Sequence, residues 1–142
     1  MREKGFNIRI SESLEALCAQ SNLIVTNTPA TQPLLFADWI KPGTLITAVG
    51  SDGAGKQELD ANIYANTDVA VVDSIPQCVL LGESHYAIQA GLIEESALVE
   101  LGSIIAGEVA GRQDDDQIIV ADLTGVAVQD IQIAKSVLLN LE

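Results

Sequence analysis

Apolar residues cluster along this chain in short runs that predict strands separated by helices. Four runs predict buried strands, over residues 23–26, 44–49, 69–73 and 118–122. Residues 6–10 alternate apolar and polar side chains and predict one more short strand. Strands that are apolar on both faces are typical of parallel sheets covered by helices, so the pattern predicts an α/β fold with a parallel sheet.

Helical segments are expected between these strands. Ser11 can cap the first helix, with Leu14 and Leu17 on its inner face. The last helix is long and places Ile131 and Leu138 on one face. The other expected helices cover residues 58–65, 76–82 and 87–111, and the long C-terminal helix covers 126–141.

Composition limits which classes of protein and which partners are compatible with this chain. The chain has 142 residues, 48% of them hydrophobic, which is enough for a single domain with one core. A net charge of −13 argues against nucleic acid and against an anionic membrane as partners. Cys18 and Cys78 lie far apart, which is typical of reduced thiols and predicts a cytoplasmic protein. No run has transmembrane length, and no cluster has the spacing of a metal site.

A glycine-rich loop follows the apolar run 44–49 and contains Asp52 and Lys56. Glycines let backbone N–H groups approach a ligand closely, and Lys56 can reach an anion. Ligands of parallel sheets bind beyond the carboxyl ends of the strands, and polar residues also follow the other three predicted strands. The sequence therefore predicts a ligand site built around this loop.

The same loop has the spacing of a phosphate-binding Walker A loop, Gly50-x-x-x-x-Gly55-Lys56. Three features count against a nucleotide triphosphatase. Gln57 stands where a Ser or Thr should ligate magnesium, Asp52 would place a carboxylate among phosphates, and the helix expected next is short. A nucleotide triphosphatase is therefore the least favoured of three alternative functions.

Four segments, in order along the chain, resemble the ornithine cyclodeaminase/mu-crystallin family. They are Thr-x-Thr-Pro at 26–29, the glycine-rich loop at 49–60, Val-Asp-Ser-x-x-Gln-Cys at 72–78 and Asp-x-Thr-Gly-x-Ala-x-Gln-Asp at 122–130. Family members are NAD(P)-dependent, usually homodimeric, and act on amino acids or cyclic imines. They include ornithine cyclodeaminases, an alanine dehydrogenase type and ketimine reductases.

The resemblance implies roles for five residues. Asp52 would be the catalytic acid–base near the substrate. Thr26 and Thr28 would line the dinucleotide, NAD(H) or NADP(H), with Gly50 and Lys56 close to it. No metal is implied.

The chain departs from the family pattern because it has neither the G-x-G-x-x-G/A pyrophosphate turn nor the half that selects the substrate. Residues 1–142 thus resemble a single domain, the C-terminal part of an NAD(P)-binding Rossmann domain: a partial parallel sheet without its first βαβ unit, with a long C-terminal helix. We expect a fragment of an oxidoreductase or cyclodeaminase that is inactive alone, binds NAD weakly or not at all, and forms a homo-oligomer, a dimer. The alternative is a non-catalytic binding or assembly protein of the mu-crystallin type.

Overall fold

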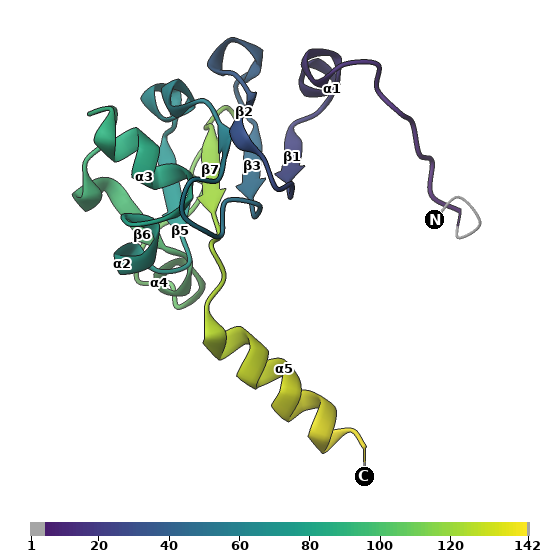
Figure 1. The fold of residues 1–142 in the computed structure, drawn as a ribbon, viewed down its shortest axis with the longest axis vertical. Helices are drawn as coiled ribbons and strands as arrows, with labels where there is room; N and C mark the ends of the chain where they lie inside the picture. Colours follow the sequence, from purple (N-terminus) through teal and green to yellow (C-terminus); the bar gives the residue numbers. More distant parts are fainter. Residues whose placement is uncertain (1–4, 142) are drawn as a thin grey trace.

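The fold is built on a five-stranded parallel sheet, which the computed structural model shows within its described residues, 5–141 (Figure 1). The strands lie in the order β1-β3-β7-β5-β6, and each pairs in parallel with its neighbour. Their bounds are β1 Leu23–Thr26, β3 Leu45–Ala48, β7 Ile119–Asp122, β5 Val69–Val72 and β6 Leu98–Glu100. The predicted α/β class, the parallel sheet and the C-terminal helix are confirmed.

The carboxyl ends of four strands meet in one row. Thr26 pairs with Ala48, Ala48 with Asp122, and Asp122 with Val72. This register places the loops that follow these strands at one edge of the sheet, as the apolar pattern predicts. The sheet is held by aliphatic side chains such as Ile46 on β3, which is fully buried.

One strand prediction and one helix prediction are wrong. Residues 6–10 are extended but form no strand, and Phe6 and Ile10 are exposed, because no strand of the described part of the chain lies alongside them. Residues 98–100, within a region expected to be helical, form β6 instead. Leu98 pairs with Ala70 of β5 and is buried there, so sheet pairing overrides the local preference.

A small parallel pair, which the sequence pattern does not predict, lies outside the main sheet. It joins β2 (Thr31–Leu35) to β4 (Gln57–Leu59). The helix expected over residues 58–65 is therefore replaced by β4 and a 3₁₀ helix, Ala61–Asn66. The apolar residues Leu35 and Leu59 are both buried at this pair, which explains its stability.

The helices differ from expectation in extent as well as at their ends, because the regions expected as helices over 76–82 and 87–111 divide into shorter helices. The cap of the first helix is Ser13 rather than Ser11, since the Ser13 Oγ accepts from the Ala16 N–H (3.1 Å). Leu14 and Leu17 of this helix remain partly exposed, and Cys18 is the residue that packs inward. The helices are α1 Leu14–Gln20, α2 Ile75–Cys78, α3 Gly82–Gln89, α4 Leu101–Ile105 and α5 Ala127–Leu139.

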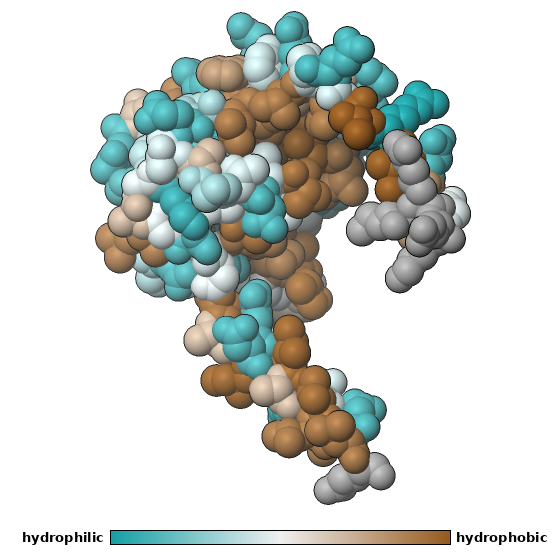
Figure 2. Space-filling view, turned by 45° about the vertical axis from the view of Figure 1, so that its right-hand side comes forward, coloured by the Kyte–Doolittle hydropathy of each residue, from teal (hydrophilic) through white to brown (hydrophobic). Residues whose placement is uncertain are grey.

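Two parts of the molecule present apolar side chains to solvent. Helix α5 projects from the body (Figure 1), and none of its residues is buried. Strand β1 is at the edge of the sheet, with Leu23 and Val25 both 62% exposed. Figure 2 shows apolar surface along α5 and on the face of the body that looks toward the N-terminal segment. Among the described residues, no helix combines the length and the apolar character that crossing a membrane requires.

Candidate functional site

An ion pair stands in the loop that joins β3 to β4. The Lys56 Nζ donates to the Asp52 Oδ1 at 2.5 Å, and both side chains reach solvent. The hydrogen bond and the charge of Lys56 lower the pKa of Asp52 below its ordinary value. Asp52 is therefore an ionised carboxylate at neutral pH, accessible to a ligand and able to accept a proton.

Beneath this pair lies a fully buried carboxylate, Glu58 of β4. Its Oε1 accepts from the Thr28 N–H (2.6 Å) and the Thr28 hydroxyl (2.8 Å), and its Oε2 accepts from the Gly50 N–H (2.9 Å). Glu58 thus ties the end of β1 to the end of β3. Sequence reasoning missed it, although an acid between Gln57 and Leu59 in a half-buried segment is a signal that could have found it.

A second buried carboxylate, Glu83 of α3, supports the first. It accepts from the backbone N–H groups of Glu58 (2.7 Å) and Leu59 (3.0 Å). Burial raises the pKa of Glu83 to about 7, with smaller contributions from the neighbouring charges of Asp122 and Glu58. Glu83 therefore satisfies two backbone N–H groups of β4, in addition to the pairing of this strand with β2.

Asp122 is the third buried acid at this edge of the sheet. It accepts from the Ser84 N–H at 2.8 Å, where α3 begins, and burial raises its pKa to about 6. Gly82 has φ +78°, and an added Cβ would lie 2.7 Å from either carboxylate oxygen of Asp122. Gly82 therefore opens a helix against Asp122, whereas the sequence pattern placed it at the end of one.

The segments 72–78 and 122–130 meet in a closed polar cluster. Asp73 accepts from the Thr124 hydroxyl (3.1 Å) and the Gly125 N–H (2.6 Å), and Gln77 donates to the Thr124 hydroxyl (2.9 Å). Burial raises the pKa of Cys78 to about 12, so this thiol stays protonated and is no nucleophile. The cluster fixes the point at which the chain leaves the sheet toward α5.

All five residues proposed from the sequence lie where β1 and β3 end. Thr28 and Gly50 share the carboxylate of Glu58, and Asp52 and Lys56 form the ion pair above them. Thr26 is buried at the end of β1, and its hydroxyl has no hydrogen-bond partner within residues 5–141.

The loop is not a phosphate-binding loop of the Walker A kind. Lys56 leads directly into strand β4, whereas such a loop opens a helix whose N-terminus receives the phosphates. Lys56 is also engaged by Asp52. In the part of the chain that the structure describes, no group of three or more His, Cys, Asp or Glu residues could hold a metal ion.

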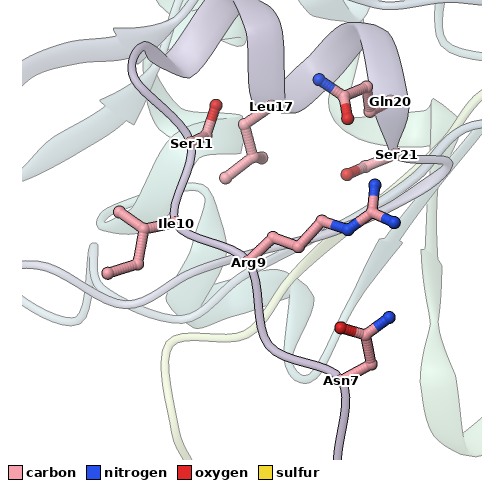
Figure 3. A pocket seen from close by; sticks show the side chains of 7 residues that line it. All are labelled: Asn7, Arg9, Ile10, Ser11, Leu17, Gln20 and Ser21. Atoms are coloured by element: carbon pink, nitrogen blue, oxygen red, sulfur yellow. The ribbon is translucent and has the colours of Figure 1, made fainter.

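The hollow shown in Figure 3 lies elsewhere, between the N-terminal segment and α1. It has a volume of about 390 Å³ and is lined by polar side chains that include Asn7, Arg9 and Gln20. None of the five candidate residues lines it. The edge of the sheet, where the ion pair stands, is thus the candidate site.

Comparisons with known proteins agree with the four segments. A cyclodeaminase of Sinorhizobium fredii, itself uncharacterized, is 45% identical over 133 residues, which are 93% of this chain and 40% of that protein. An archaeal alanine dehydrogenase dimer with bound NAD superposes with a TM-score of 0.86 at 36% identity, over 94% of this chain and 41% of its own. The Δ1-pyrroline-2-carboxylate reductase of Thermococcus litoralis, solved with NADH and L-proline, gives 0.88 at 29% identity, over 94% and 42%.

The chain therefore spans about two fifths of the length of the relatives that it matches. The ornithine cyclodeaminase/mu-crystallin family profile matches residues 1–142. The chain belongs to the ornithine cyclodeaminase/mu-crystallin family.

Proposed function

We propose that this chain is the C-terminal part of the NAD(P)-binding domain of an oxidoreductase or cyclodeaminase that acts on an amino acid or a cyclic imine. The observation that carries the proposal is the exposed Asp52–Lys56 pair at the carboxyl edge of a parallel sheet. Ligands of such sheets bind at this edge. Relatives with the same sheet were solved with NAD or NADH, and one also with L-proline.

The residues at the edge suit a dinucleotide. The buried Thr26 hydroxyl lacks a partner among residues 5–141, and a buried polar atom without a partner is costly unless a ligand or water satisfies it. Thr26, Thr28, Gly50 and Lys56 would hold the cofactor. When bound, NAD(P) would supply the hydride acceptor or donor.

Asp52 would move the proton that accompanies this chemistry. Its carboxylate would take a proton from the substrate nitrogen during oxidation and return it during reduction. Lys56 keeps the carboxylate ionised in the resting protein by lowering its pKa, and it stands ready to contact an anionic group of the ligand.

The chain alone should be inactive. Its 142 residues contain no G-x-G-x-x-G/A turn, which in dinucleotide-binding domains supplies the backbone donors for the pyrophosphate. We therefore propose that turnover requires the remaining portion of a full-length relative, and that the assembled protein is a homodimer, as the archaeal alanine dehydrogenase is.

A chimera tests this function. The corresponding part of the archaeal alanine dehydrogenase is replaced by this chain, and NAD reduction with alanine is measured. We expect turnover, and a loss of about 100-fold or more in kcat for Asp52→Asn with little change in NAD affinity. Asp114→Asn, in an exposed acidic turn, is the matched control and should leave kcat unchanged.

Two results would count against the proposal. Near-normal kcat for Asp52→Asn would remove Asp52 as the proton-transferring group. A folded chimera that binds NAD but turns over no amino acid or imine would favour the non-catalytic alternative.

A further inference from the structure

We propose that Glu58 is a positioning residue, whose carboxylate fixes where Asp52 stands. The inference rests on the proposed function in one respect, namely that Asp52 is the group that moves the proton. The contacts of Glu58 themselves are independent of that function.

Glu58 joins the two ends of the loop that carries Asp52. The loop begins after Ala48, where β3 ends, and runs to β4, and the Gly50 N–H near its start donates to the Glu58 Oε2 near its end at 2.9 Å. Inside the loop, the Ser51 hydroxyl donates to the Lys56 carbonyl (2.7 Å). Asp52 therefore sits on a loop that two side chains close, Glu58 where the loop ends meet and Ser51 within the loop.

Glycine at position 50 leaves room for the Glu58 carboxylate. A Cβ on Gly50 would lie 2.4 Å from the Glu58 Oε1 and 2.5 Å from the Thr28 carbonyl oxygen. No other residue fits at position 50 while Glu58 keeps its place. The same oxygen that fills this space also accepts from the Thr28 N–H and hydroxyl, which joins the loop to the end of β1.

Glu58 is itself held in place by the second buried carboxylate, Glu83. Its backbone N–H and that of Leu59 donate to the two carboxylate oxygens of Glu83. Glu58 is 0% exposed and Glu83 is 1% exposed, so neither side chain can swing into solvent. The result is a chain of contacts from α3 through β4 to the loop, with each step made by a carboxylate on backbone N–H groups.

The Glu58→Gln variant removes this closure with little change in volume. An amide presents one acceptor oxygen, so it can serve Thr28 or Gly50 but not both, and its NH₂ group then faces an N–H donor. We expect the loop to loosen and the Asp52–Lys56 pair to open. The Asp52 titration midpoint should then rise toward its ordinary value, because Lys56 no longer stabilises the carboxylate.

The experiment uses NMR on the purified 142-residue chain. Glu58→Gln should raise the midpoint of the Asp52 carboxyl carbon toward the ordinary value of an aspartate. It should also speed hydrogen exchange of the Gly50 amide by about tenfold or more. Glu100→Gln is the matched control, because the Glu100 Oε1 also accepts a backbone N–H, that of Ile75 (3.0 Å), away from the loop. The control should leave the Gly50 amide and the Asp52 midpoint unchanged.

An unchanged Asp52 midpoint in folded Glu58→Gln would overturn the inference, as would an equal shift in Glu100→Gln. If Glu58→Gln does not fold, Thr28→Val decides, because it removes the hydroxyl that donates to the Glu58 Oε1 (2.8 Å) and leaves the carboxylate in place. The Gly50 amide must then exchange faster and the Asp52 midpoint must rise; no change in either would overturn the inference. Catalysis is not the readout, so failure of the proposed function in the chimera would leave this test intact.

Discussion

Replacing Glu83 by glutamine should change how the stability of this chain depends on pH. Glu83 is almost fully buried, and burial raises its pKa from the ordinary 4.5 to about 7. Between these two values the folded chain keeps a proton that the unfolded chain has released. The free energy of unfolding must therefore fall as pH rises through this window.

The size of the effect follows from the shift. A change from 4.5 to about 7 is roughly 2.5 pKa units, which corresponds to about 3 kcal/mol at about 1.4 kcal/mol per unit. This stabilisation is fully present below pH 4.5 and is lost as pH rises through about 7. Asp122, with its pKa raised from 3.8 to about 6 by burial, adds a loss of the same sign at lower pH. The two losses are not additive, because the charge of Asp122 also raises the pKa of Glu83.

The assay is urea unfolding of the wild-type and Glu83→Gln chains at pH 5, 6 and 7.5. Glutamine cannot ionise, but its NH₂ group faces one of the two backbone donors that the Glu83 oxygens accept, so at pH 5 the variant should be the less stable chain by about 1–3 kcal/mol. From pH 5 to pH 7.5 the wild-type chain should lose about 2–3 kcal/mol relative to the variant, because the variant has no buried charge to form. Glu95→Gln, at an exposed position, should follow the wild-type curve.

The reasoning would be refuted by either of two outcomes. Parallel curves for the wild-type and Glu83→Gln chains would mean that Glu83 does not titrate between pH 5 and 7.5. A wild-type stability that rises with pH across this range would mean that the carboxylate is favoured by its two backbone donors more than burial disfavours it.

Three further predictions follow from other contacts. Gly82→Ala should destabilise the chain by about 2 kcal/mol or more in urea unfolding, because of the positive φ and the approach to Asp122, whereas Gly53→Ala, which meets nothing within 4 Å, should be nearly neutral. The purified chain should self-associate in analytical ultracentrifugation through its exposed apolar surface, and the double change Ile131→Lys and Leu138→Lys on α5 should weaken this association; a monomeric wild type would contradict it. Phosphate-release assays should show no magnesium-dependent ATP hydrolysis, since the glycine-rich loop leads into a strand.

The part of the fold that the sequence predicts is the part that is locally determined. Four continuous apolar runs become β1, β3, β5 and β7, because such runs favour strands of a parallel sheet, although β1 at the sheet edge leaves Leu23 and Val25 exposed. The missed strands have no such run. Leu98–Glu100 is three residues long and becomes a strand only through pairing with β5, while Thr31–Leu35 contains Pro33, which is tolerated because β2 lies at an edge.

The sequence predicts the candidate residues at the strand ends and in the glycine-rich loop, but not the two buried acids that support them. Asp52 and Lys56 stand in an exposed loop whose glycines and charges are visible in the sequence. Glu58 and Glu83 are 25 residues apart and meet only because α3 packs against β4, a pair of elements that apolar periodicity does not place together. Long-range contacts of this kind depend on the tertiary structure, so no local pattern contains them.

The acidic residues that give the net charge of −13 have two different roles in the structure. Most acids are exposed and keep the chain soluble. Four others accept backbone N–H groups that the loops and helix starts at the sheet edge leave unpaired: Glu58, Glu83, Asp73 and Asp122. A carboxylate is suited to this because its two oxygens can accept several donors at once. It follows that an acid beside a glycine at a strand end is first a candidate for holding backbone. Asp52, which keeps its carboxylate in solvent and pairs with Lys56, is the acid of the glycine-rich loop for which we propose a chemical role.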